Sequence, residues 1–294
     1  MPNAFFNLRK LRATFRIFRF ITRHPLTADH PFAAIARFLR WQVSSRIHEV
    51  QTIDWIGDAR IVARRGMAGI TGNIYCGLHE FADMAFLLNL VRPGDLFLDI
   101  GANVGSYTIL ASKVRGAKTI AVEADPTTME ALHRNINVNQ IEELVTTHQV
   151  VVGAEKGTIH FTIGLDSVNR VVTADHLNAR MMSVETLDSI VGDEAPTFVK
   201  LDVEGYENAV LEGASSILSR PSLLAIETEL ADVDVIKRLE SAGFHRASYL
   251  PHERKLVKGV VENGAHNALF IRDFEACARR IAEAVPIIVL GHRV

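Results

Sequence analysis

Short apolar runs alternate with helical apolar patterns through the middle of the chain. Residues 96–98 form a buried-strand run behind the turn Pro93-Gly94-Asp95, and a second apolar run occupies residues 119–122. Between the two runs, apolar residues recur at the spacing of one helix face, at Tyr107, Leu110, Ala111 and Val114. Strands that alternate with helices predict an α/β fold with a doubly wound, mostly parallel sheet.

Residues at the ends of these two strands indicate a ligand site. The loop Asp99-Ile-Gly-Ala-Asn-Val-Gly105 follows the first strand, and Glu123 ends the second. Gly101 and Gly105 allow the backbone to approach a ligand closely and to turn sharply. A carboxylate at the end of the next strand can accept hydrogen bonds from both hydroxyls of a ribose. We therefore predict a site for a nucleoside cofactor.

The spacing of the loop separates two kinds of cofactor. A dinucleotide fingerprint needs three glycines as G-x-G-x-x-G, whereas this loop has two glycines with an acid in front of them. Asp99 would repel a pyrophosphate but suits the sulfonium and amino groups of S-adenosylmethionine. A methyl-donor site is the favoured interpretation. A dinucleotide site and a turn that uses glycine only for its geometry are the alternatives.

Four motifs resemble the FkbM family of S-adenosylmethionine-dependent methyltransferases, over about residues 72 to 272. They begin at Phe97, Val122, Val199 and Ala225, and read FLDIGANVGSYT, VEADP, VKLDVEGYE and AIETE. The resemblance implies a class I methyltransferase (Rossmann-like) fold with a seven-stranded sheet whose last pair of strands is antiparallel. It also implies methylation of hydroxyl groups on sugars, lipids or polyketide-like products.

The resemblance also places the residues that bind the cofactor. It puts five residues of the first two motifs around S-adenosylmethionine: Asp99, Gly101, Asn103, Gly105 and Glu123. Ala124 stands beside that last acid, where the family more often has proline, and Glu80 matches a family glutamate that orders the cofactor pocket. The sheet pattern adds two residues: the third strand, residues 148–152, ends at Gly153 and Ala154, which would lie beside the adenine.

The fourth strand carries the predicted chemistry. Alternation over residues 198–204 sends Lys200, Asp202 and Glu204 to one face at the strand end. A hydroxyl nucleophile must lose its proton as the methyl group arrives, so we assign Asp202 as the general base or as the group that orients the acceptor. Glu204 is its neighbour, and Lys200 keeps the pair ionised or contacts an acidic acceptor. A carboxylate pair that only ties the loop to Lys200 is the plainer interpretation.

Further polar residues flank this strand and predict contacts to the acceptor: His79, Asp166, Asn169 and Glu227. The plainer interpretations are a histidine that caps or packs against the helix starting at residue 81, and an ordinary surface loop over residues 164–170. The strand end lacks the Pro-Pro-Tyr pattern of nucleobase methyltransferases, so no nucleic-acid partner is expected, whereas methylation of another amine stays open.

No Cys/His cluster has metal-ligand spacing, and no metal is predicted. A divalent ion held by Asp202, Glu204 and a third acid remains an alternative. A cofactor-binding scaffold without catalysis is the alternative from a different class. The carboxylates retained at the strand ends favour an enzyme.

The net charge of −2 hides an asymmetry along the chain. Residues 1–46 contain nine Lys or Arg and one acid, whereas the remainder is acidic. Two helical stripes lie side by side in this segment, one apolar (Phe5, Leu8, Leu11, Phe15, Phe18) and one basic (Arg9, Arg12, Arg16, Arg19, Arg23). The pattern predicts peripheral contact of residues 1–24 with an anionic membrane surface. A helix docked on the acidic domain of its own or a neighbouring subunit, a targeting peptide and a nucleic-acid arm are the alternatives.

Four segments are expected: a basic amphipathic helical arm (1–46), a small β-rich lead-in segment (47–72), the methyltransferase domain (73–274) and a C-terminal helix and tail (275–294). The arm contains a second helix with one apolar face, formed by Phe32, Ile35, Ala36, Leu39 and Val43. Cys76 and Cys277 have no partner spacing and favour packed positions in a reducing compartment. No apolar run approaches the roughly 20 residues of a membrane span. We expect a cytoplasmic protein, peripheral at the inner face of the membrane, with a homo-oligomer left open.

Overall fold

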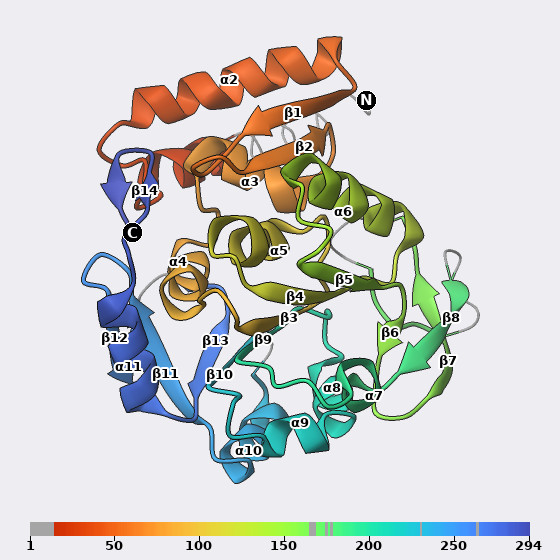
Figure 1. Ribbon diagram of the computed structural model, residues 1–294. Helices are drawn as coiled ribbons and strands as arrows, with labels where there is room; N and C mark the ends of the chain where they lie inside the picture. Colours follow the sequence, from red (N-terminus) through yellow and green to blue (C-terminus); the bar gives the residue numbers. More distant parts are fainter. Residues whose placement is uncertain (1–14, 165–168, 174–175, 177–178, 230, 263–264) are drawn as a thin grey trace, which may run out of the picture.

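The central sheet of the computed structural model has eight strands in the order β12-β11-β13-β10-β9-β3-β4-β5 (Figure 1). The structure describes residues 15–164, 169–173, 176, 179–229, 231–262 and 265–294. The strands are β3 (Leu96–Ile100), β4 (Lys118–Val122), β5 (Val145–His148), β9 (Phe198–Leu201), β10 (Ala225–Thr228), β11 (His245–Leu250), β12 (Lys255–Lys258) and β13 (Ala268–Ile271). Pairing is parallel from β5 through to β10, and β13 lies antiparallel between β10 and β11. The predicted doubly wound, mostly parallel fold is confirmed, with the expected antiparallel strand.

The sheet differs from the prediction at both edges. An eighth strand, β12, forms because the chain returns antiparallel to β11 and places Leu256 in the core. The third strand ends at His148 rather than at residue 152. Residues 151–152 instead form β6 (Val151–Val152), which pairs with β8 (Ala179–Glu185) in a separate sheet completed by β7 (Gly157–Thr162). An apolar run predicts a strand but does not specify its partner.

Helices cover both faces of the central sheet (Figure 1). One face carries α4 (Phe81–Leu90), α5 (Ser106–Ile109), the π-helical turn η1 (Leu110–Val114) and α6 (Pro126–Asn139). The other carries α7 (Leu187–Val191), α8 (Glu207–Glu212), α9 (Ser215–Ser219) and α10 (Val233–Ser241). Successive residues of a strand point to opposite faces of the sheet. Phe97 and Phe198 pack in the hydrophobic cluster around α4, whereas the next residues, Leu98 and Val199, pack in the cluster under α8 to α10.

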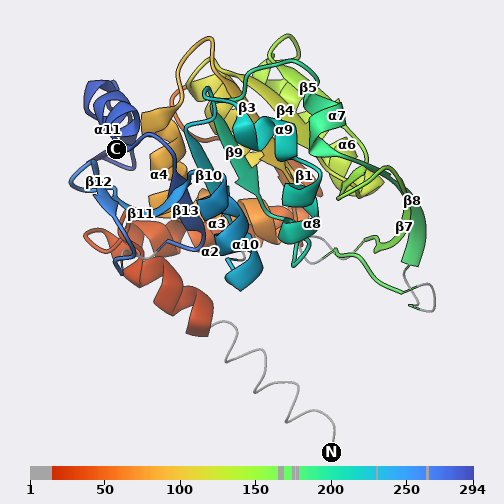
Figure 2. The ribbon, with the colours of Figure 1, turned by 90° about the horizontal axis from the view of Figure 1, so that it is seen from below.

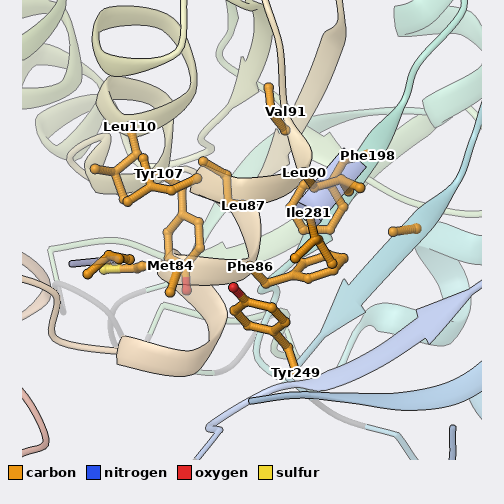
Figure 3. Close-up of a cluster of buried hydrophobic side chains, with 14 of the residues drawn as sticks. Met84, Phe86, Leu87, Leu90, Val91, Tyr107, Leu110, Phe198, Tyr249 and Ile281 are labelled. Carbon is orange, nitrogen blue, oxygen red and sulfur yellow. The ribbon is translucent and has the colours of Figure 1, made fainter. Parts of the chain in front are cut away.

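Helix α4 is buried along its whole length. Figure 3 shows its side chains between those of α5 and η1 on one side and those of β9 and β11 on the other. The Phe86 ring lies 5.5 Å from the Phe198 ring and 5.6 Å from the Tyr249 ring, measured between centroids. The C-terminal helix α11 (Phe274–Glu283) closes this cluster with Cys277 and Ile281. The packing holds the start of α4, and hence Glu80 before it, in a defined position.

The N-terminal part packs on the domain through a hairpin and three helices. The hairpin joins β1 (Val50–Asp54) to β2 (Arg60–Arg64), and α2 (Pro31–Ile47) lies beside α3 (Ala68–Cys76) (Figures 1 and 2). Residues 15–23 are helical and end before Pro25, as the proline predicts. The residues of the two predicted stripes that precede Phe15 lie outside the described residues.

The second helix of the arm is confirmed, but it buries a different face. Phe38 and Trp41 are in the core, whereas Phe32 and Leu39 of the predicted apolar face are exposed. The reason is aromatic packing, because the Phe38 ring meets the rings of both Phe18 and Tyr75. Both cysteines are free and buried. In the part of the chain that the structure describes, we find no helix that is both long enough and apolar enough to span a membrane.

Candidate active site

The glycine loop joins β3 to α5 at the carboxyl edge of the sheet. Gly101 has φ +80° and Gly105, the N-cap of α5, has φ +91°. A β-carbon on Gly101 would overlap the carbonyl oxygen of Asp202, because the loop passes directly over the end of β9. A β-carbon on Gly105 would instead meet Leu132 of α6. The first glycine is therefore required by close backbone approach and the second by helix packing.

Glu123 follows β4 and turns its carboxylate back toward this loop. Its two oxygens accept hydrogen bonds from separate backbone amides, Asn103 N at 3.0 Å and Asp125 N at 2.8 Å. The side chain is nearly buried, and burial raises the pKa of Glu123 to about 7. Each carboxylate oxygen can accept a second hydrogen bond, so the pair can receive the two hydroxyls of a ribose.

A buried row of charges crosses three parallel strands. The strand register sets Lys200 of β9 directly between Asp99 of β3 and Glu227 of β10. All three are at most 2% exposed. Burial raises the pKa of Asp99 to about 6 and that of Glu227 well above its usual range. Burial lowers the pKa of Lys200, but the surrounding carboxylates outweigh it and raise that pKa, so Lys200 is the fixed cation of the row.

Two consecutive residues of α5, Tyr107 and Thr108, hold this row in place. The Tyr107 hydroxyl donates to Glu80 Oε2 at 2.6 Å, and Lys200 Nζ lies 4.6 Å from the centre of the Tyr107 ring. The Thr108 hydroxyl donates to Asp99 Oδ2 at 2.6 Å. The hydrogen bond between Tyr107 and Glu80 therefore ties the start of α4 to α5.

Three carboxylates lie at the mouth of the site. Lys200 Nζ donates to Asp202 Oδ2 at 2.6 Å, and the Asp202 side chain is 35% exposed. Glu204 is exposed and adopts φ +50°. Burial, followed by the charges of Asp202 and Glu204, raises the pKa of Glu229 to about 7. A carboxylate that titrates near neutrality, beside one held by an ammonium, suits proton removal from an acceptor.

A cavity of about 330 Å³ brings most of the predicted site residues together; we call it the donor cavity. Its lining includes His79, Glu80, Asp99, Gly101, Asn103, Glu123, Ala124, Asn169, Lys200, Asp202 and Glu204. Asn169 is buried and its amide donates to Asp125, the N-cap of α6, at 3.2 Å. This contact ties the loop after β7 to the cavity wall.

Other predicted residues lie elsewhere. Gly105, Gly153 and Ala154 do not line the donor cavity. For Gly153 and Ala154 the reason is that the strand before them, β6, belongs to the small sheet and not to the central sheet. Glu227 lines a neighbouring cavity of about 550 Å³, which we call the acidic cavity. Asp166 lies outside the described residues.

Several lining residues were not predicted. The donor cavity has an apolar wall made by Val150, Val151, Val152, Phe161, Val171 and Tyr206. These side chains come from the small sheet, from residues beside its strands and from the loop after β9. Valine and aromatic residues are common in any strand, so nothing in the sequence distinguishes them. Glu229, the last residue of the AIETE motif, also lines the cavity.

Within the described residues, no group of three or more His, Cys, Asp or Glu side chains is arranged to hold a metal ion. The site instead combines buried carboxylates with a shaped apolar wall, and these features suit an organic cation that carries a nucleoside.

Binding of S-adenosylmethionine is expected to weaken as the pH falls through 7 toward 5.5. The pKa of Glu123 is raised to about 7 and that of Asp99 to about 6, so both carboxyls become neutral in this range. A neutral Asp99 loses its attraction for a sulfonium, and a neutral Glu123 is a weaker acceptor of hydrogen bonds from the ribose hydroxyls. We expect the dissociation constant to rise about tenfold between about pH 7.5 and about pH 5.5. Calorimetric titration across this range checks the expectation, and a flat profile would contradict it.

Comparison with known proteins identifies the family of the chain. A model of the methyltransferase FkbM domain matches residues 99–246. The ribosomal protein L11 methyltransferase of Chloroflexus aurantiacus is 32% identical over 90 residues, which are 30% of this chain and 27% of that protein. The hexuronic acid methyltransferase AglP of Haloferax volcanii is 26% identical over 161 residues, 53% of this chain and 66% of that protein. The crystal structure of methyltransferase FkbM from Methylobacillus flagellatus has a TM-score of 0.44 at 16% identity, covering 69% of this chain and 52% of that one. Each alignment spans less than two thirds of the other protein.

Proposed function

The chain belongs to the methyltransferase FkbM domain family, and we propose that it is an S-adenosylmethionine-dependent methyltransferase that methylates a hydroxyl oxygen of a sugar, glycan, lipid-linked or polyketide-like acceptor. The observation that carries the proposal is the trio of carboxylates at the mouth of the donor cavity, Asp202, Glu204 and Glu229, beside the buried ammonium of Lys200. A hydroxyl needs such a base, because its proton must leave as the new bond to carbon forms.

The residues present fit the donor. Glu123 would hold the ribose hydroxyls, the apolar wall would pack on the adenine, and Asp99 would face the cationic end. When bound, S-adenosylmethionine supplies an electrophilic methyl group on a positively charged sulfur. Asp202 would orient the acceptor hydroxyl, because its own carboxylate is fixed by Lys200. The hydroxyl proton passes to Asp202 or to the adjacent Glu229, and the buried row of charges keeps these groups aligned.

A second candidate is methylation of a protein amine. The resemblance to ribosomal protein L11 methyltransferases supports a protein acceptor, although the first of those alignments covers only 27% of the relative. The alignment with the hexuronic acid methyltransferase covers more of both chains and favours a sugar acceptor.

Transfer of a deuterated methyl group distinguishes these candidates. The full chain would be incubated with trideuteromethyl-labelled S-adenosylmethionine and fractions of glycans, lipid-linked sugars and proteins, with Glu123→Ala as the donor-binding control. The proposal expects label on a carbohydrate or polyketide oxygen, as an ether that survives mild alkali. Label lost in alkali would indicate a carboxyl ester, and label on lysine or an N-terminus would contradict the hydroxyl acceptor.

A further inference from the structure

A third cavity, of about 450 Å³, adjoins the donor cavity; we call it the basic cavity. His79 lines both the donor and the basic cavities, and His266 lines both the acidic and the basic cavities. The three cavities therefore share walls at the carboxyl edge of the sheet, next to the start of α4. Nothing in the catalytic assignment above uses the basic cavity.

The basic cavity differs sharply in charge from its neighbours. Its lining is Arg16, Arg19, Phe20, Arg23, His24, Pro25, His79, Phe81, Ala82 and His266. No acidic side chain is among these described residues, whereas the donor and acidic cavities are both lined by several carboxylates. Burial lowers the pKa of His24 to about 4, so that ring is neutral and the positive charge rests on the arginines.

The helix that carries these arginines is docked, not free. Ile21 is fully buried, and the Phe20 ring meets the His79 ring at 5.0 Å between centroids. The ring of His24 is hydrogen-bonded to the carbonyl oxygen of His79 at 3.2 Å. The structure thus favours the docked alternative for residues 15–23, with the basic stripe held over the edge of the site.

The guanidinium groups of Arg16, Arg19 and Arg23 have no ion pair or hydrogen bond to another described side chain or backbone group. Other arginines of the fold are used internally, for example Arg272, which donates to backbone carbonyls, and Arg280, which pairs with Asp95. Three like charges on two turns of one helix repel one another. An anion with several oxygen atoms would relieve this repulsion and could accept forked hydrogen bonds from more than one guanidinium.

We propose that the basic cavity binds a phosphate group carried by the methyl acceptor, so that the acceptor is a phosphorylated or phosphate-linked molecule. The proposal rests on the proposed function. Phosphate is favoured over a single carboxylate because three guanidiniums match a group with more oxygens and greater charge. The shared wall at His79 then lets the phosphate lie in the basic cavity while a hydroxyl of the same molecule reaches Asp202.

Titration with inorganic pyrophosphate tests the site directly. The full chain, saturated with S-adenosylhomocysteine, is compared with Arg16→Ala/Arg19→Ala/Arg23→Ala. We expect pyrophosphate affinity to fall about tenfold or more in the triple variant, and to weaken with added salt. Equal affinity in the two proteins, or no binding of pyrophosphate to the unmodified chain, would overturn the proposal.

A matched control removes three exposed arginines that lie outside the cavity, in Arg40→Ala/Arg64→Ala/Arg65→Ala. This variant should keep the pyrophosphate affinity of the unmodified chain. Both triple variants should keep the affinity for S-adenosylhomocysteine, which is measured separately. If the unmodified chain binds pyrophosphate but not S-adenosylhomocysteine, the methyltransferase proposal fails and the phosphate site stands. Failure of the proposed function is therefore distinguishable from failure of the phosphate site.

Vesicles identify the source of the phosphate. Cosedimentation with phosphatidylcholine vesicles that contain about 30 mol % phosphatidylglycerol measures attraction to lipid headgroups. Vesicle binding that pyrophosphate displaces and that the Arg16/Arg19/Arg23 variant loses supports a lipid-carried phosphate. Pyrophosphate binding without vesicle binding supports a soluble phosphorylated acceptor.

Discussion

Gly101→Ala is expected to abolish detectable binding of S-adenosylmethionine and to lower the free energy of unfolding by about 3 kcal/mol or more. Two causes add. The backbone of Gly101 has φ +80°, which strains any residue with a β-carbon. The new β-carbon would also overlap the backbone carbonyl of Asp202, which cannot rotate away as a side chain could. Denaturant unfolding and calorimetric titration measure the two effects.

Gly94→Ala is the matched control. Gly94 has φ +90°, but no atom lies within 4 Å of the position that its β-carbon would occupy. It therefore carries the backbone strain without the collision, and should cost about 1 kcal/mol and leave donor binding unchanged. Equal losses in the two variants would show that the close approach of the loop to β9 has no role.

Asp202→Asn is expected to reduce the rate of methyl transfer by about 10² to 10⁴ while changing donor affinity less than threefold. Asparagine keeps the shape and can still accept from Lys200, but it cannot take a proton. The rate would be measured in single turnovers with the acceptor identified by the labelling experiment, and donor affinity by calorimetry.

Glu204→Gln and Glu229→Gln show which carboxylate at the mouth of the donor cavity acts as the base. Glu204 is more exposed and lacks the contact with Lys200, so its substitution should slow transfer only several-fold. A near-normal rate in Asp202→Asn with a severe loss in Glu229→Gln would move the base to Glu229, whose pKa is raised to about 7 by burial and by the neighbouring carboxylates. A near-normal rate in all three variants would contradict general-base catalysis by this trio.

The strand ends were predictable because local chemistry marks them. An apolar run followed by a glycine loop predicted β3 and α5. The order Asp125-Pro126 is typical of a helix start, and α6 begins there, with the Asp125 carboxylate accepting from two backbone amides. Parallel strands bring their carboxyl ends to one edge, so Asp99, Glu123 and Asp202 were expected to converge, and all three line the donor cavity.

Contacts between elements were not predictable in the same way. The row of Asp99, Lys200 and Glu227 depends on the register between three strands, which no single strand encodes. Tyr107 fits an apolar helix face in the sequence, yet its hydroxyl reaches Glu80 and its ring receives Lys200. The buried face of α2 was missed because aromatic contacts of Phe38 outweigh a longer but more weakly packed stripe.

The most direct test is calorimetric titration of the full chain and of Glu123→Ala with S-adenosylmethionine, S-adenosylhomocysteine and NAD. We expect micromolar binding of both sulfur nucleosides, weakened about a hundredfold in Glu123→Ala because two ribose hydrogen bonds are lost, and no binding of NAD. Binding of NAD, or failure of both sulfur nucleosides to bind the unmodified chain, would contradict the assignment of the donor cavity to S-adenosylmethionine.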